Sequence, residues 1–458
     1  MATTYQISSS DSCSAAAQKI NDSVSNLNNA IGSGGGGGSA DTVVGRNQDA
    51  VQRIYAAKKH VIESGSGTPG SDSIRNAANN FCIAHGSDFH ADLQRWKNFL
   101  EFAEGVDGIQ AILCTGDFAA NLGLTSVERM TDELDDVTKP IMLAVGNHDR
   151  YGITNAQLAT AYKMDERNND IVTDFTPSGG TQVDGDANCL YYYVDFDNKN
   201  NVKGNGEYSG IDKPSPHVNK LRFIVLNQYD LTTTERSKLG ADFHYTQEQI
   251  DWFIKVLENT PNTTGVIVCM HGKESVVANT GNKKFWQRNF QWGNLAPTAY
   301  SGTIIEDIIA AFRTGTNIDK SFSISNNDDA TVSVETNFSA AGSFICYMVG
   351  HAHHDQTGYS ANHPDQLYLM CPCSCLQNDW GATGNSADTS GNNIHSFGND
   401  VGDMPRVEGT RTQDCFNVYG IDTISKRIRY VRVGSDINDL GQAKDMDYYP
   451  YEQAPSNS

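Results

Sequence analysis

The sequence predicts an α/β fold for most of this 458-residue chain. Between about residue 78 and residue 435, apolar runs of strand length alternate with stretches whose apolar residues recur at helical spacing. Strand–helix alternation of this kind is typical of an α/β domain. The first 77 residues lack the alternation. We therefore divide the chain into an N-terminal helix and tether (1–40), a linker helix (41–77), the main domain (78–435) and a C-terminal tail (436–458).

Five apolar runs are expected to be central strands, and each ends directly before a short polar motif. These runs are residues 81–84, 111–114, 141–145, 266–270 and 344–349. Two further runs, at 415–421 and 427–433, flank a short connection and predict a hairpin that closes the domain.

Four helices are expected between these strands. The first two, after residue 90 and from about residue 125, repeat apolar residues every three or four positions. Thr125 and Glu128 have the spacing of a capping box, and Pro140 is expected to end that helix. The third begins at Thr246 and the fourth at Thr303. Three polar segments, at 175–216, 314–341 and 377–404, interrupt the pattern as long loops. They either wall a substrate pocket or are solvated decoration.

The N-terminal region predicts a separate helix on a tether. Between residues 14 and 31, five apolar residues are spaced as a heptad seam, namely Ala17, Ile20, Val24, Leu27 and Ile31. A helix this short is marginal alone, so it either forms a coiled coil with partner chains or a larger particle, or lies on the main domain of its own chain. The glycine-rich run at 32–39 is a flexible tether.

The motifs that follow the five strands supply oxygen and nitrogen ligands. They are Asp88-Phe89-His90, Gly116-Asp117, Gly146-Asn147-His148-Asp149, His271 and Gly350-His351-Ala352-His353. Functional side chains gather at the carboxyl ends of strands, so five strand ends in one sheet would bring them together. Carboxylate and imidazole suit Mn, Fe, Zn or Co, and the set is too large for one tetrahedral zinc. Two metal ions with a shared carboxylate are a standard device for displacement at phosphorus.

Each of these residue types also has an ordinary interpretation that involves no metal. A single histidine after a strand usually belongs to a loop or the core, and Asp and Asn are common in turns. We interpret the seven other histidines in this way: His60, His85, His217, His244, His354, His363 and His395. The complete ordered set of motifs, each after a strand, favours a metal site.

The ordered motifs resemble the calcineurin-like metallophosphoesterase superfamily, with its pattern D-x-H, G-D, G-N-H-[DE], H and G-H-x-H, over roughly residues 78–435. The resemblance implies two packed mixed sheets flanked by helices, and hydrolysis of phosphate mono- or diesters by a metal-bound hydroxide. It implies two divalent ions (Mn, Fe or Zn). The first would be held by Asp88, His90 and His353, the second by Asn147, His271 and His351, and Asp117 would bridge them. It also implies His148 as the general acid, Asp149 as the residue that orients the His148 ring, and, more loosely, Arg150 as a charge near the phosphate.

Two branches of the superfamily are set aside. Purple acid phosphatases place a tyrosine ligand three residues after the G-D aspartate, where this chain has Ala120. The arginine pattern of protein serine/threonine phosphatases is absent. A hypothesis from a different class remains open: the heptad seam and tether weakly resemble phage tail attachment segments. The chain would then be a structural virion component whose phosphoesterase-like domain binds or processes the host envelope.

Composition limits the partners and the compartment. The formal net charge of −21 disfavours nucleic acid, because such binding depends on Lys and Arg contacts to phosphates. No run of 18 apolar residues predicts a membrane span, and the N-terminus lacks signal-peptide features. Cysteines inside the predicted strands suit synthesis in a reducing cytosol, so we expect a cytoplasmic or virion-associated protein. Cys371, Cys373 and Cys375 form either a soft metal site or, more simply, one buried strand face.

Overall fold

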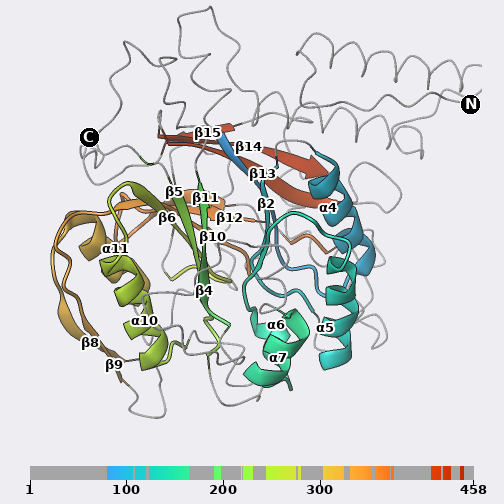
Figure 1. The fold of residues 1–458 in the computed structure, drawn as a ribbon, viewed down its shortest axis with the longest axis horizontal. Coiled ribbons are helices and arrows are strands. Elements are labelled where there is room, and N and C mark those ends of the chain that lie inside the picture. The colour runs from blue at the N-terminus through green and yellow to red at the C-terminus, as the bar shows by residue number, and fades with distance from the viewer. Residues whose placement is uncertain are drawn as a thin grey trace, which may run out of the picture.

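The computed structural model has an α/β fold of two mixed sheets with helices on the outside (Figure 1). The structure describes residues 80–106, 109–119, 123–163, 190–197, 218, 220–230, 244–274, 277–279, 303–323, 331–351, 356–371, 373–375, 414–423, 426–434 and 444–447. The expected helix at 14–31, the glycine tether and the linker helix at 41–77 lie outside these residues and stay predictions.

The first sheet joins strands from both ends of the domain. Its order is β15 (Lys444–Asp447), β14 (Arg427–Gly434), β13 (Cys415–Asp422), β1 (Asn80–Gly86), β2 (Ala111–Cys114) and β3 (Ile141–Leu143). β1, β2 and β3 are parallel, with Ile83 opposite Ala111 and Ile112 opposite Ile141. The predicted hairpin is confirmed as β13 and β14. β15 pairs with β14, so the sheet continues into the segment that we expected to be a tail after residue 435.

The second sheet carries the other two motif strands. Its order is β4 (Tyr192–Asp197), β5 (Lys220–Val225), β6 (Thr264–Cys269), β10 (Ser343–Val349), β12 (Leu367–Met370), β11 (Gln356–Ser360) and β7 (Val277–Asn279). β5, β6, β10 and β12 are parallel. The expectation that all five motif strands share one sheet is wrong, because β1, β2 and β3 belong to the first sheet and β6 and β10 to the second.

The two sheets pack against each other through aromatic side chains. The ring centroid of Phe81 on β1 lies 4.9 Å from that of Phe196 on β4 and 5.6 Å from that of Phe223 on β5. The Tyr192 hydroxyl accepts a hydrogen bond from the Leu143 amide (2.8 Å) and donates one to the Leu143 carbonyl (2.9 Å), which joins β4 to β3. Both faces of the central strands are buried, as expected of parallel strands covered on both sides.

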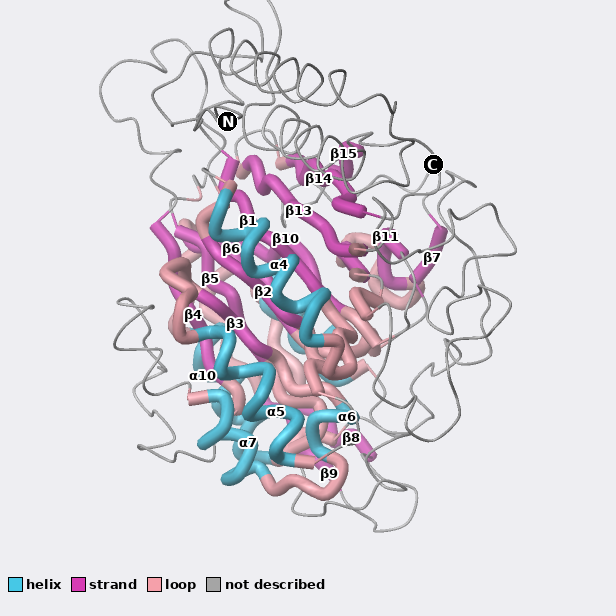
Figure 2. Tube along the Cα trace, turned by 90° about the vertical axis from the view of Figure 1, so that its right-hand side faces the viewer, coloured by secondary structure: helices cyan, strands magenta, loops and turns pink. Residues whose placement is uncertain are grey.

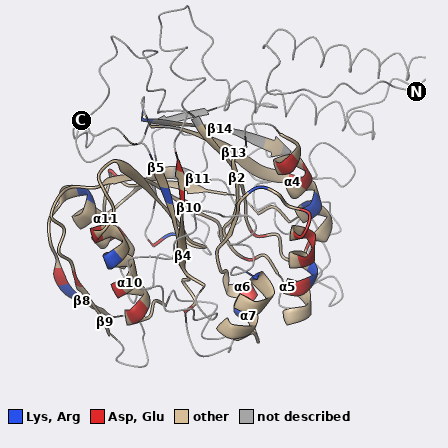
Figure 3. Ribbon diagram, in the orientation of Figure 1, with Lys and Arg blue, Asp and Glu red and all other residues tan. Residues whose placement is uncertain are grey.

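Helices cover the outer faces of the two sheets. α4 (Leu93–Gly105) and α5 (Leu124–Thr131) lie on one side of the molecule, and α10 (Gln247–Glu258) and α11 (Ile304–Thr314) on the other (Figure 1). The shorter elements are the 3-10 turn η2 (Asp132–Leu134), α6 (Asn147–Arg150) and α7 (Asn155–Tyr162). Figure 2 shows α4, α5 and α7 in front of the strands. In Figure 3 charged residues are concentrated on the helices, while the strands between them are mostly uncharged.

The helix starts were predicted with mixed success. Thr246 caps α10, since its side chain accepts a hydrogen bond from the Gln249 amide. The capping box at Thr125 and Glu128 is wrong. α5 begins at Leu124, directly after Gly123 with a φ of 79°, and its cap has no side-chain hydrogen bond, so Thr125 lies inside the first turn. Glycine adopts a positive φ without steric cost, and the helix starts two residues earlier than a cap at Thr125 would place it.

The polar segment at 314–341 is only partly a loop. It contains a two-stranded sheet of β8 (Asp319–Ser323) and β9 (Thr331–Glu335). β9 alternates exposed and buried residues, the period expected of a strand with one face against the protein. Among the described residues, no helix is long and apolar enough to cross a membrane.

Candidate metal centre

The loops that carry the motifs meet where strand ends of both sheets adjoin. The loops after β1 and β2 are joined backbone to backbone: the Asp88 amide donates to the Gly116 carbonyl (3.0 Å), and the His90 amide donates to the Asp117 carbonyl (2.9 Å). In the second sheet, the Gly350 amide donates to the His271 carbonyl (2.7 Å). The gathering of the motifs at one place is confirmed, although two sheets supply them.

Asp117 lies at the centre of the cluster. Its Oδ2 atom is 3.2 Å from Nε2 of His271, 3.9 Å from Nε2 of His90 and 3.9 Å from Nε2 of His148. Oδ1 of Asp88 lies 3.9 Å from Nε2 of His90 and 4.0 Å from Nε2 of His271. Two ligands that each lie about 2.1 Å from one ion are at most about 4.2 Å apart, so these separations fit ligands that share metal ions.

The second sheet adds His351 to the cluster. Its Nδ1 atom lies 3.1 Å from Nε2 of His271, and its amide donates to Oδ2 of Asp88 (2.9 Å). Among the described residues, two groups of side chains have donor atoms close enough to hold an ion: His90, Asp117 and His148, and Asp117, His271 and His351. Asp117 belongs to both groups, which is the arrangement that a bridging carboxylate requires. Neither group contains a cysteine.

Four of these residues have a strained backbone. The φ angles of Asp88, His90, Asp117 and His351 are 54°, 45°, 48° and 67°. A residue other than glycine adopts this left-handed region rarely and at a cost of about 1–2 kcal/mol. Strain of this kind clusters at functional sites, where the surrounding structure holds it.

Glycine is required before two of the ligands because the loops approach too closely for a side chain. Gly116 has a φ of 96°, and a Cβ there would lie 2.6 Å from Nδ1 of His271. A Cβ on Gly350 would lie 2.7 Å from Oδ2 of Asp88. The glycines of the G-D and G-H-x-H motifs therefore let ligand side chains of one loop pass against the backbone of the next.

Burial and mutual charge set the protonation of the cluster. Burial alone would raise the pKa of Asp117, but the imidazoles of His271, His148 and His90 hold it well below its usual range. Burial alone would lower the pKa of His271, but the Asp117 and Asp88 carboxylates outweigh it and raise the pKa to about 9. Since ligand imidazoles must be neutral, bound cations would take the place of these protons beside the carboxylates.

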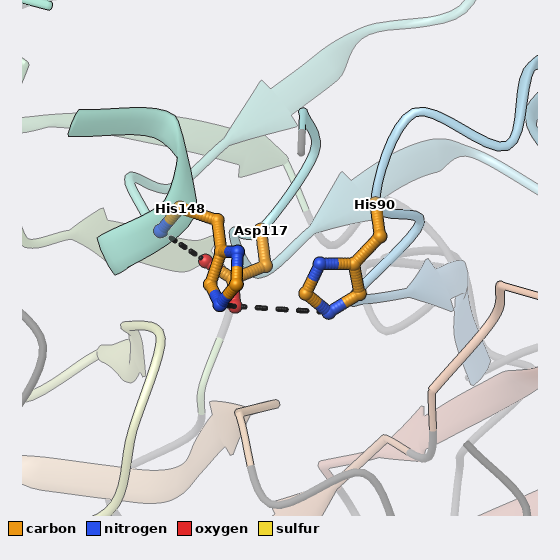
Figure 4. A group of neighbouring side chains, drawn as sticks. All are labelled: His90, Asp117 and His148. Atoms are coloured by element: carbon orange, nitrogen blue, oxygen red, sulfur yellow. Dashed lines mark hydrogen bonds and ion pairs between the residues drawn. The ribbon is translucent and has the colours of Figure 1, made fainter. Parts of the chain in front are cut away.

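His148 is more exposed than His90 and His271. Its side chain is 13% exposed, whereas His90 is 1% exposed and His271 is fully buried. Its amide donates to Oδ1 of Asp117 (2.8 Å), and its ring stands edge-on to that of His90 at a centroid distance of 4.6 Å (Figure 4). His148 is thus the member of the first group that is open to solvent.

Asn147 is the buried amide of the site. Its Nδ2 atom donates to the Tyr151 hydroxyl (2.7 Å), and its Oδ1 atom accepts from the Tyr229 hydroxyl (3.5 Å). The ring of Tyr229 also lies 6.0 Å from that of His271. Tyr229 therefore contacts both Asn147 and His271, the two residues expected to share the second metal with His351.

Asp149 has a different set of contacts from the expected one. Its Oδ1 atom accepts from the Ala119 amide (2.7 Å) and its Oδ2 atom from the Gly146 amide (2.9 Å). Burial and the charge of Asp117 raise its pKa to about 7, although the two amides oppose this. These bonds join the loops after β2 and β3, so the structure gives Asp149 a positioning role in the backbone. Its role in orienting the His148 ring stays a prediction.

Arg150 is not placed to bind phosphate. Its side chain is fully buried, and its guanidinium donates to the carbonyls of Tyr229 (3.3 Å) and Ile153. The expectation of a charge near the phosphate is therefore wrong for this conformation. The expectation used only the charge of Arg150 and its place after the G-N-H-D motif. In the structure its side chain turns inward and links α6 to the loop after β5.

Other predicted residues lie elsewhere or are structural. His353 and Ala120 lie outside the described residues. Cys371 and Cys373 are buried, and their thiols donate to the carbonyls of His85 (3.2 Å) and Asp88 (3.1 Å). The metal-capable groups found in the described part of the chain contain no cysteine. Cys371, Cys373 and Cys375 are buried as expected, but they follow β12, which ends at Met370, so they do not form a strand face.

The sequence analysis missed the residues that support the ligands. Thr115, Tyr151, Gln228 and Tyr229 all contact a motif residue or the residue next to one. One signal was present: the apolar run at 221–226 ends in the polar residues 227–230, as the motif strands do. It was overlooked because these residues match none of the five motifs.

Carboxylates and imidazoles at the strand ends of packed α/β sheets are typical of hydrolases that use divalent metal ions. The model of the calcineurin-like phosphoesterase family matches residues 82–354, and this chain belongs to that family. It is therefore a metal-dependent phosphoric ester hydrolase, as the motifs predicted.

Two solved structures are similar to this chain at low sequence identity. A dimetal phosphatase from Danio rerio is 10% identical, with a TM-score of 0.44 over 81% of this chain and 99% of its own. The phosphopantetheinyl hydrolase from Mycobacterium tuberculosis is 9% identical, with a TM-score of 0.33 over 64% of this chain and 89% of its own. A search of curated protein sequences gave no significant match.

Proposed function

We propose that this protein hydrolyses phosphate mono- or diesters at a centre for two divalent ions (Mn, Fe or Zn) that share Asp117. One observation carries the proposal: Oδ2 of Asp117 lies within ligand-sharing distance of imidazole nitrogens from three separate loops. A carboxylate oxygen that faces several imidazoles is explained by metal ions between them. A purely structural ion pair would need only one.

The proposed ligands divide into two sets. Asp88, His90 and His353 would hold the first ion, and Asn147, His271 and His351 the second. When bound, the ions would supply Lewis acidity that neutralises phosphoryl oxygens and lowers the pKa of water. The chain's own contribution is to hold the ligands in position. For His271 this includes a fixed tautomer, because its Nδ1 atom can only donate to the Thr115 carbonyl (2.7 Å), which leaves the Nε2 lone pair facing Asp117.

We assign the leaving-group proton to His148. Three observations support this role over that of a ligand: its side chain is partly exposed whereas those of His90 and His271 are buried, its amide is bound to Asp117, and the proposed ligand sets are complete without it. An imidazole titrates in the range that proton transfer to a departing alkoxide needs. Because Nε2 of His148 lies 3.9 Å from the shared carboxylate oxygen, its proton would be delivered beside the phosphoryl group.

The test is a substrate and metal screen. Chelated protein should be inactive, and Mn, Fe or Zn should restore hydrolysis of nitrophenyl phosphate, bis-nitrophenyl phosphate or both. His351→Ala, purified in parallel, controls for contaminating phosphatases, because it lacks one proposed ligand. Activity that survives chelation, or that the variant retains in full, would contradict the proposal. The alternative of a structural virion component depends on residues 14–31, and no observation in the described residues favours it.

A further inference from the structure

We propose that Gln228 is a positioning residue that fixes His271 for metal binding by clamping the peptide bond between His271 and Gly272. The inference rests on the proposed function, in which His271 is a metal ligand. Gln228 contacts none of the proposed ligands directly, and nothing in its sequence neighbourhood resembles a ligand motif.

The Gln228 side chain forms two hydrogen bonds with the backbone of a single residue. Its Oε1 atom accepts from the Gly272 amide (2.6 Å), and its Nε2 atom donates to the Gly272 carbonyl (3.0 Å). Because a backbone amide only donates and a carbonyl only accepts, these partners fix which end of the carboxamide faces which group. The side chain is fully buried, so water cannot replace either bond.

The clamp extends the hydrogen bonding between the β5 and β6 segments beyond the ends of the two strands. β5 and β6 are parallel, with Val225 opposite Cys269, and the Leu226 amide still donates to the Cys269 carbonyl (2.9 Å). Beyond this point the side chain of Gln228 makes the bonds to the β6 segment that the backbone would make in a longer strand. The loop that begins at His271 is thereby held at the carboxyl end of the sheet.

The peptide unit between His271 and Gly272 is held on both sides. Its carbonyl, that of His271, accepts from the Gly350 amide (2.7 Å), and its N–H, that of Gly272, donates to Gln228 (2.6 Å). The orientation of this peptide sets the direction in which the His271 ring leaves the backbone. With both of its polar groups bound, the peptide cannot rotate. The ring is then held with its Nε2 atom 3.2 Å from Oδ2 of Asp117.

A second glutamine, Gln249, holds the backbone of the residue before Gln228 in the same way. Oε1 of Gln249, on α10, accepts from the Asn227 amide (2.9 Å), and its Nε2 donates to the Asn227 carbonyl (3.0 Å). Gln249 is also fully buried. Two carboxamides in series therefore connect α10 to the backbone beside His271, and the second carboxamide fixes the segment from which the first extends.

Metal binding measures this role directly. Gln228→Met removes both bonds while keeping an unbranched side chain of similar length. Loss of an outer hydrogen-bond partner of a metal ligand typically lowers metal affinity about 10–100-fold. We expect a loss of this size for one of two Mn²⁺ ions, with the other unchanged, in equilibrium dialysis of the full chain. Thermal melting checks that the variant is folded.

Two glutamines that make equivalent bonds elsewhere serve as matched controls. Gln366 is fully buried, donates to the Glu306 carbonyl (2.9 Å) and accepts from the Tyr347 hydroxyl (2.7 Å). Gln247 clamps the amide and carbonyl of Ser333 (both 2.8 Å) at the surface of α10. Their Met variants should bind both ions with the affinity of the parent protein.

The outcomes separate this inference from the proposed function. His271→Ala should lose one ion; if it keeps both, the metal assignment itself is wrong. If His271→Ala loses an ion but Gln228→Met keeps both at parental affinity, the positioning role is overturned and the metal assignment stands. If Gln228→Met does not fold, Gln249→Met decides, because it loosens the same segment one step further away. It should weaken the same ion by a smaller factor, and parental affinity in that variant would overturn the inference.

Discussion

The two halves of the metal centre are held in different ways. The loops after β1 and β2 are bonded to each other through their backbones, and Asp88, His90, Ala91 and Asp117 all have a positive φ. In the second sheet His351 shares this strain, with a φ of 67°, but His271 does not have a positive φ. The His271 peptide is held by the Gln228 side chain and its ring by the Thr115 carbonyl. The geometry of the first half is therefore encoded locally in the backbone, whereas in the second half the position of His271 depends on side chains distant in sequence.

This difference explains which parts of the site can be found from sequence. Backbone-encoded geometry leaves a compact signature, since glycine and the ligand must be adjacent where loops cross closely, as at Gly116 in the first half and Gly350 in the second. Side-chain support leaves none, because the carboxamide of Gln228 acts on a residue 44 positions away. The first half of the centre is accordingly easier to predict than the support of the second.

The largest effect is expected where the two halves share a residue. Asp117→Asn removes the charge of the one carboxylate that two ions would share, so metal content measured by elemental analysis should fall for both ions, and hydrolysis should fall with it. Asp195→Asn is the matched control, since Asp195 is a buried carboxylate that pairs with Arg222 at 2.8 Å, away from the loops that carry the ligands. The control should keep its metals. Parental metal content in Asp117→Asn would contradict a shared site.

The next effect concerns His148, which is hydrogen-bonded to Asp117 but is not one of the proposed metal ligands. His148→Ala should keep both ions and lose about 10²–10⁴ in rate, the usual contribution of one general acid. The loss should be smaller for a nitrophenyl ester than for an alkyl ester, because nitrophenolate leaves without protonation. Equal losses for both leaving groups would contradict the role of proton donor. Loss of an ion would instead identify His148 as a ligand, as its place beside His90 and Asp117 permits.

The sequence predicted the elements better than their arrangement. The five motif strands and the closing hairpin were found because apolar runs and turns are local features. The division into two sheets was not found from the strands themselves, because the apolar runs of β3 and β6 look alike whichever sheet receives them. Local sequence is also insufficient for Arg150. Its residue type predicted a charge near the phosphate, but only the packing shows that the guanidinium turns inward to backbone carbonyls. The start of α5 is a further example, because the positive φ of Gly123 sets it and the residue pattern did not predict it.

The smallest effect tests whether strain in the first half is real. Ala91 has a φ of 62° and is buried, while Ala119, also buried and in the neighbouring loop, does not have a positive φ. Replacing either residue with glycine loses one buried methyl group and loosens the unfolded chain equally. Only Ala91→Gly also relieves a left-handed conformation, which costs a residue with a Cβ about 1–2 kcal/mol. In urea unfolding of metal-free protein, Ala91→Gly should therefore be more stable than Ala119→Gly by about that amount. Equal stabilities would mean that the loops after β1 and β2 store no strain at this residue, and the contrast between the two halves would then rest on the glycines alone.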